Sequence, residues 1–145
     1  IGWLPDVARW ARVVSSLLKP GGTLYLLEGH PSLMALNEKT PNLEHGFDWR
    51  TPLNAPIVED EATTYTGDTT PVTATTTNSW IHPLSDIINA VIGAGLRLDY
   101  LHEHEELAWQ FAPIMVAKEG KRRMWVLPEG FKKLPLAFSL QATKS

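Results

Sequence analysis

The segment of residues 17–31 constrains the fold of this chain more than any other, because a helix end, a tight turn and an apolar strand follow one another directly. A helix cannot continue through Pro20, and Gly21 accepts the left-handed backbone that commonly follows a helix. The apolar and β-branched run of residues 23–27 is typical of a parallel strand covered on both faces. This order predicts an α/β fold with helices flanking a sheet.

Composition excludes several classes of function. The chain has 145 residues, which favours one domain, and its 13 basic and 16 acidic residues give a net charge of -3 that is unsuited to nucleic acid. It has no cysteine and no apolar run of the roughly 20 residues that cross a bilayer, so we expect a cytoplasmic protein without a membrane partner. Because Ile1 stands where a start Met is usual, we expect the coding sequence to extend upstream.

Two amphipathic helices and an edge strand are expected from periodicity. Residues 4–19 place apolar side chains on one helix face, and Pro5 and Asp6 suit the first turn. A second helix is expected to begin at Pro83 or Leu84 and to end at Gly93 and Gly95. Apolar and charged residues then alternate over 96–100, which predicts a strand at a sheet edge with one face exposed to solvent. A final strand is expected over residues 134–142.

Residues 38–81 differ in character, since Pro, Thr, Asn and Asp dominate and helical periodicity disappears. Residues 61–66 and 73–80 are rich in β-branched and aromatic side chains, with turn formers between them. We expect a lid-like insertion that forms a long-looped β-hairpin.

Several short sequence motifs together point to a family. They are residues 3–6, 18–22, 28–31 and 94–96, the pair Trp80 and His82, and residues 102–104 and 134–140. In this order they make the whole chain resemble the C-terminal half of a class I S-adenosylmethionine-dependent methyltransferase, within a bacterial subgroup that acts on small molecules.

The resemblance implies a partial Rossmann-like methyltransferase sheet made of the fifth, sixth and seventh strands, with the seventh antiparallel between the other two. It also implies S-adenosylmethionine as the methyl donor and a small molecule as acceptor. The glycine-rich turn that holds the donor in this family follows a strand and opens a helix, whereas Gly21 and Gly22 follow a helix. We therefore expect a missing N-terminal half and weak donor binding by this chain alone.

Polar residues at the end of the predicted strand are the first candidates for chemistry, because ligands in open α/β sheets bind beyond the carboxyl ends of strands. Glu28 and His30 are the candidate catalytic residues, as general base or acceptor-orienting groups. The alternative is that both only bond backbone amides. By resemblance, Ile1, Gly2 and Trp3 lie where such enzymes touch the donor.

Acceptor contacts are expected from Trp80 and His82, which precede the second helix. The alternative for His82 is a polar residue that satisfies a helix start. His102 and His104 project from one strand face, but a metal site needs a third ligand, so we expect no metal and solvated strand-end residues.

Two alternative functions remain open from the sequence. A non-catalytic assembly module would form a homodimer through the exposed edge of the strand at residues 23–27. A histidine-based metallohydrolase would require a bound metal ion.

Overall fold

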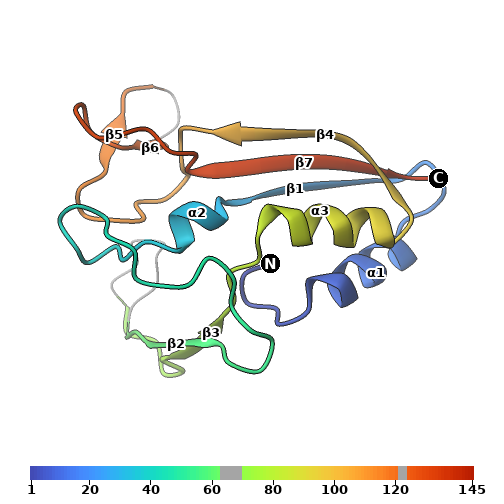
Figure 1. Cartoon of the computed structure of the whole chain (residues 1–145), viewed down its shortest axis with the longest axis horizontal. Helices are drawn as coiled ribbons and strands as arrows, with labels where there is room; N and C mark the ends of the chain where they lie inside the picture. The colour runs from blue at the N-terminus through green and yellow to red at the C-terminus, as the bar shows by residue number, and fades with distance from the viewer. Residues whose placement is uncertain (63–69, 121–123) are drawn as a thin grey trace.

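The structure is a computed structural model that describes residues 1–62, 70–120 and 124–145 (Figure 1). Its elements in chain order are α1 (Val7–Leu17), β1 (Thr23–Gly29), α2 (Pro31–Met34), β2 (Ile57–Asp60), β3 (Thr76–Ser79), α3 (Leu84–Gly93), β4 (Leu96–His104), β5 (Val116–Lys118), β6 (Met124–Val126) and β7 (Ala137–Lys144).

The main sheet has three strands in the order β1-β7-β4, and β7 runs antiparallel to both neighbours. Leu140 of β7 stands opposite Leu26 of β1 on one side and Leu101 of β4 on the other. The last strand therefore lies antiparallel between the other two, as the family resemblance implied. Because β1 and β4 are both antiparallel to β7, they run parallel to each other, and their carboxyl ends meet at the same edge of the sheet.

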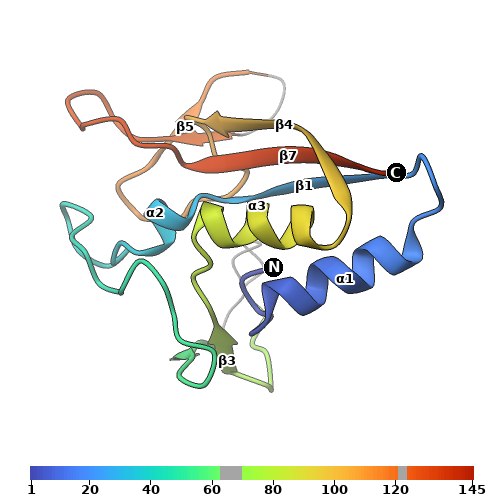
Figure 2. The ribbon, with the colours of Figure 1, turned by 45° about the vertical axis from the view of Figure 1, so that its right-hand side comes forward.

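Helices α1 and α3 both lie on one face of this sheet (Figure 2). The side chain of Asp6 accepts a hydrogen bond from the backbone nitrogen of Arg9 at 2.8 Å, so the cap holds the start of α1 at Val7 rather than at Leu4. Helix α3 begins at Leu84 and ends at Gly93, where the sequence predicted.

The turn between α1 and β1 follows the predicted chemistry. Gly21 has a φ of +76°, and its backbone nitrogen donates to the carbonyl of Lys144 at 2.9 Å. The same turn therefore joins the start of β1 to the end of β7, at the edge of the sheet opposite the strand ends that carry the candidate residues.

Buried apolar side chains fix the helices on the sheet. Ile87 of α3 packs with Phe138 and Leu140 of β7, while Val91 packs with Leu96 and Ala142. A third cluster, built from Leu33, Leu43, Leu107, Ala112, Met115, Leu136 and Ala137, lies at the carboxyl end of the sheet. The core thus continues from the helices into the loops beyond β1.

The prediction that residues 23–27 are covered on both faces is wrong for this chain. Leu24 and Leu26 are half-buried against the helices, but Tyr25 and Leu27 are 59% and 53% exposed on the other face. Neither α1 nor α3 reaches that face, and side chains alternate between faces along a strand. The strand is therefore covered by helices on one face only.

The expected hairpin is present, with different bounds. Strand β2 pairs antiparallel with β3, from Ile57 opposite Ser79 to Asp60 opposite Thr76. The first strand thus lies at residues 57–60 rather than 61–66, and residues 63–66 of that prediction lie outside the described part of the chain. The strand begins at Ile57 because residues 57–60 pair with residues 76–79. Ile, Val and Thr all have high β propensity, so propensity alone does not locate the paired segment.

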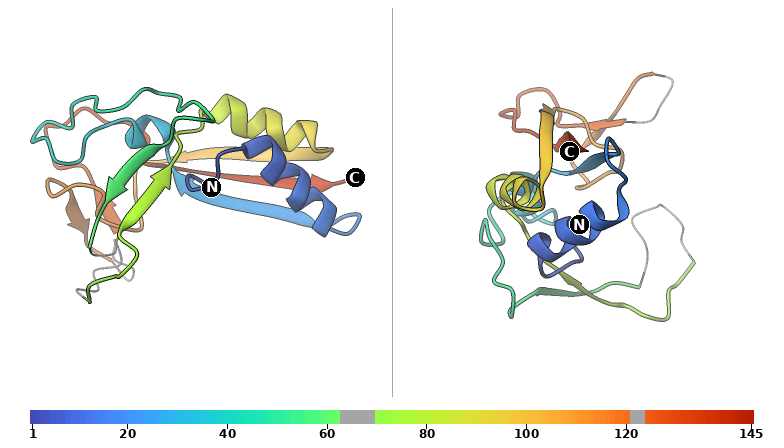
Figure 3. Two further views of the ribbon diagram at one scale, coloured as in Figure 1. Left: turned by 90° about the horizontal axis from the view of Figure 1, so that it is seen from below. Right: turned by 90° about the vertical axis from the view of Figure 1, so that its right-hand side faces the viewer.

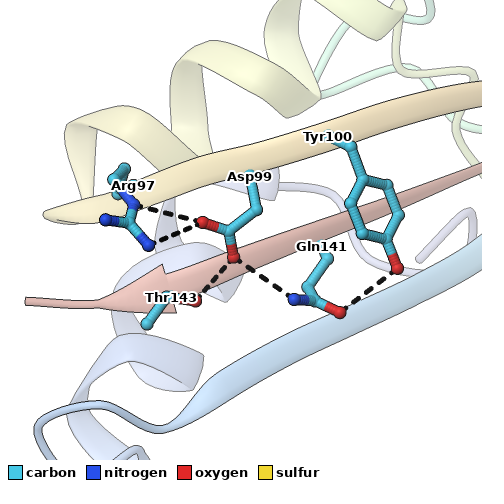
Figure 4. Close-up of polar contacts among 5 residues, drawn as sticks. All are labelled: Arg97, Asp99, Tyr100, Gln141 and Thr143. Carbon is cyan, nitrogen blue, oxygen red and sulfur yellow. Dashed lines mark hydrogen bonds and ion pairs between the residues drawn. The ribbon is translucent and has the colours of Figure 1, made fainter.

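Strand β4 is a sheet edge, as predicted, and it carries a register shift between Leu98 and Tyr100. Asp99, at this shift, accepts hydrogen bonds from Thr143 at 2.5 Å, from Gln141 at 3.4 Å and from Arg97 (Figure 4). The hydroxyl of Tyr100 donates to Gln141 at 3.2 Å. The hydrogen bond from Thr143, helped by those from Arg97 and Gln141, holds the pKa of Asp99 below its ordinary value.

The final strand, Ala137–Lys144, begins three residues later than the sequence predicted. Leu134 and Leu136 instead join the cluster beyond the sheet, where the small β5–β6 pair also packs through Trp125. In the described part of the chain, no helix is long and apolar enough to span a bilayer.

Candidate active-site cleft

A cleft of about 660 Å³ lies beyond the carboxyl end of β1. Its walls include residues 1–3, the end of β1, the segment around α2, the β2–β3 pair, and residues 80–82, which follow β3. Figure 3 shows the β2–β3 pair crossing this end of the sheet near the N-terminus. The cleft therefore lies where an open α/β sheet usually binds its ligand.

Six of the seven site residues named from the sequence line this one cleft. They are Ile1, Gly2, Trp3, Glu28, Trp80 and His82. The seventh, His30, is buried and is not part of the lining. Residues that lie up to 81 positions apart are thus brought together by the fold.

Three contacts fix the N-terminal segment across the cleft. The backbone nitrogen of Ile1 donates to the Glu28 carboxylate. The backbone nitrogen of Trp80 donates to the carbonyl of Gly2 at 2.7 Å. Residues 1–4 therefore bridge the end of β1 and the segment that leaves the hairpin.

The third contact determines which ring nitrogen of His82 carries a proton. Its Nε2 atom lies 2.7 Å from the carbonyl oxygen of Leu4, and a carbonyl only accepts, so Nε2 must carry a proton. In the neutral ring, Nδ1 then holds a lone pair. No residue in the described part of the chain hydrogen-bonds to this Nδ1 atom.

Trp80 is held by the loop that faces it. Its indole Nε1 donates to the carbonyl of Leu53 at 3.2 Å, and the backbone nitrogen of Ile81 donates to the Thr51 hydroxyl at 3.0 Å. Ile81 itself is buried. The segment that carries Trp80 and His82 is therefore anchored on both sides.

His30 has a different environment. Its Nδ1 atom accepts from the backbone nitrogen of Ser32 at 3.1 Å, which caps the short helix α2, and its Nε2 atom lies 3.0 Å from Oε1 of Glu103. Burial lowers the pKa of His30, and the hydrogen bond and charge of Glu103 oppose this in part. The geometry matches the alternative in which this histidine bonds a backbone amide at the strand end.

Carboxylates dominate the charge of the cleft. Among the described residues, Glu28, Glu38 and Glu59 line it together with one cationic side chain, that of Lys39, whose Nζ atom lies 3.3 Å from Glu61. Burial raises the pKa of Glu38, and the charges of Glu59 and Glu61 add to this effect. The cleft is therefore poorly suited to an anionic ligand.

Among the described lining residues, four aromatic ones were not identified from the sequence, namely Phe47, Trp109, Phe111 and Phe138. Three lie in loops whose positions depend on long-range packing, so the sequence offers no local signal for them. Gly29 is a partial clue. A Cβ atom at Gly29 would lie 2.8 Å from the end of Met34 and 3.3 Å from Trp109, so glycine permits both to approach β1.

His102 and His104 occupy structural positions on the outer face of the sheet. The His102 ring stacks on Tyr100 with centroids 4.8 Å apart, and Nε2 of His104 hydrogen-bonds to the Ser139 hydroxyl at 2.8 Å. Among the described residues, no group of three histidine or carboxylate side chains could hold a metal ion.

Two solved structures share this architecture. A Listeria monocytogenes protein assigned as an S-adenosylmethionine-dependent methyltransferase superposes with a TM-score of 0.55 and 14% identity, over 99% of this chain and 57% of its own. An S-adenosylmethionine-dependent methyltransferase from Mesorhizobium loti gives a TM-score of 0.51, with the same identity and coverage. The resemblance inferred from the sequence is thereby confirmed at the level of the fold.

The chain spans 57% of the length of these two structures. No family model matches the sequence, and no curated protein matches it either. Because identities this low show a fold rather than an activity, the reaction has to be argued from the cleft itself.

Proposed function

We propose that this chain is the C-terminal part of a cytoplasmic class I methyltransferase, which transfers the methyl group of S-adenosylmethionine to a small molecule. The observation that carries the proposal is the convergence of Trp3, Glu28, Trp80 and His82 on one cleft at the carboxyl end of β1. Shared architecture with two methyltransferases supports it.

The described residues fit one side of such a donor. A sulfonium is a cation, and the Glu28 carboxylate and the rings of Trp3 and Trp80 are groups that stabilise cations. When bound, S-adenosylmethionine supplies an activated methyl group, so the protein chiefly has to align donor and acceptor. In this proposal, Ile1, Gly2 and Trp3 contact the donor and Glu28 orients the reacting groups.

The rest of the donor site would belong to a segment that precedes this chain. Gly21 and Gly22 cannot replace the family's glycine-rich turn, because they precede β1 whereas the cleft lies at its end. The exposed pair Tyr25 and Leu27 on the outer face of β1 supports a larger parent domain, because further elements would cover that apolar surface.

Isothermal titration with S-adenosylhomocysteine tests the proposal. The 145-residue chain alone should bind more weakly than micromolar, whereas a chain extended by its upstream coding sequence should bind tightly. That upstream sequence should contain a strand followed by a glycine-rich turn. Micromolar binding by the short chain would show that the donor site is misplaced.

His30 enters the proposal as a positioning residue rather than as the base. Its two ring nitrogens are engaged by Ser32 and Glu103, which fixes the exit of β1 and hence the position of Glu28 two residues earlier. A base needs an unoccupied lone pair facing the acceptor, and His30 lies outside the cleft lining.

The assembly function is the second candidate, and the exposure of Tyr25 and Leu27 on an edge strand favours it. In that case, a second copy of the chain would cover the outer face of β1. The oligomeric state in solution distinguishes this candidate from the first.

A further inference from the structure

The cleft contains one imidazole in its lining, and the contacts of that ring define its chemistry. His82 donates from Nε2 to the carbonyl of Leu4, which leaves the lone pair of Nδ1 without a partner in the described part of the chain. A backbone carbonyl that holds one nitrogen protonated is the usual device for presenting the other as a base.

The other candidate bases of the strand end are already engaged. The Glu28 carboxylate accepts from the backbone nitrogen of Ile1. His30 uses both ring nitrogens and lies outside the lining. Among Glu28, His30 and His82, His82 is thus the residue best suited to take a proton.

The rest of the lining restricts what that proton can come from. Glu28, Glu38 and Glu59 face the same cleft as His82, and the only cationic side chain among the described lining residues, Lys39, is paired with Glu61. A carboxylate or phosphate ligand would meet net negative charge. The aromatic walls, which include Trp80, suit a flat apolar molecule.

From these contacts we infer that His82 is the general base of the proposed methyl transfer and that the acceptor is a neutral aromatic compound with an acidic hydroxyl group. This inference rests on the proposed function. The acceptor oxygen gives its proton to Nδ1 of His82 and forms a bond to the methyl carbon. The carbon–sulfur bond breaks, its electron pair stays on sulfur as a neutral thioether, and the imidazolium releases its proton to solvent.

The test uses 4-nitrophenol as the probe, because its phenolate is yellow and its binding needs no methyl donor. With the wild-type 145-residue chain, we expect the ionisation constant of the bound phenol to rise by about tenfold, since an imidazolium partner lowers a neighbouring acid's pKa by about one unit or more. In His82→Gln the amide nitrogen can still donate to Leu4, but the Nδ1 acceptor is gone. This variant should bind the probe and lose the shift.

A matched control is His102→Gln, which changes an exposed histidine on the outer face of the sheet and should keep the full shift. Nitrogen NMR of the neutral His82 ring in the ligand-free wild type gives a readout that needs no variant, and it should show a proton on Nε2 and none on Nδ1.

An unchanged shift in His82→Gln, a proton on Nδ1 of the neutral ring in the ligand-free chain, or no probe binding by the wild type would each overturn the inference. None of these results depends on the methyl donor. Failure of S-adenosylhomocysteine to bind the extended chain would instead remove the methyltransferase proposal, so the two failures are distinguishable.

Discussion

The Nε2 atom of His30 lies 3.0 Å from Oε1 of Glu103, and this contact joins the exit of β1 to the end of β4 across the intervening strand β7. Both Glu28 and Glu103 stand opposite Phe138 in the sheet register. The buried side chain of His30 therefore links the two outer strands of the sheet at the end where the cleft lies.

The buried state of His30 predicts that stability rises with pH. Because burial lowers the folded-state pKa below the ordinary value near 6.5, the unfolded chain binds more protons as pH falls through that region. Protonation at Nδ1 would also break the bond from Ser32. The free energy of unfolding, measured by urea titration, should therefore be full above pH 7 and decrease toward pH 5.

His30→Gln should flatten this dependence, and it should lower stability at neutral pH by about 1–3 kcal/mol through the loss of buried hydrogen bonds. His45→Gln, which changes an exposed histidine, should keep the wild-type slope. A slope that survives in His30→Gln would show that another group is responsible.

The turn that opens β1 gives a graded set of glycine variants. Gly21→Ala places a side chain at a φ of +76° with open space around it, so it should cost about 1 kcal/mol from the left-handed backbone. In Gly22→Ala the new Cβ would lie 2.8 Å from the carbonyl oxygen of Lys19, which is backbone and cannot easily move, so the cost should be larger.

Gly93→Ala is the matched control, because its Cβ would meet no atom within 4 Å at the end of helix α3. It should be neutral or stabilise by up to about 1 kcal/mol, as glycine is a poor helix former. Thermal unfolding of the three variants orders them, and a Gly22→Ala protein as stable as wild type would contradict the turn geometry.

The sequence determined the parts of the fold that are local. Helix α3, the turn at Gly21 and the edge strand β4 follow from periodicity and turn chemistry, so residues near each of them were enough. The antiparallel place of β7 is not local, and it was expected only through the family resemblance.

The parts that depend on distant contacts could not be predicted in the same way. Strand β2 begins at Ile57 because it pairs with Ser79, and the outer face of β1 is exposed because neither long helix covers it. At the cleft, His82 was named as a candidate from the sequence, but its tautomer depends on Leu4, which is 78 positions away. Trp109 carried no signal of its own.

The outer face of β1 predicts self-association if the assembly function is correct. Tyr25 and Leu27 are both more than half exposed on an edge strand, so a second copy could bury them. Light scattering should then show a dimer that dissociates in the double variant Tyr25→Lys, Leu27→Lys. Val13→Lys, on an exposed position of α1, should leave the dimer intact. A compact monomer at high concentration would exclude this function.

Phe138 connects the stability of the sheet to the shape of the cleft. Its side chain is 1% exposed, packs with Ile87 and Leu140, and also forms part of the cleft lining. Phe138→Ala should lower the free energy of unfolding by about 3–5 kcal/mol, because removal of a buried ring leaves a cavity.

Phe138→Leu should cost less, about 1–1.5 kcal/mol, because it keeps most of the apolar volume. The rings of His30 and Phe138 pack nearly perpendicular with centroids 6.4 Å apart, so the leucine variant should also loosen the His30–Glu103 contact. Because that contact partly offsets the lowering of the His30 pKa by burial, its loss should make stability decrease more steeply below pH 7. Urea titrations at pH 5 and pH 7 measure both effects. Equal stability of the alanine and leucine variants would show that the Phe138 ring is not tightly packed against its neighbours.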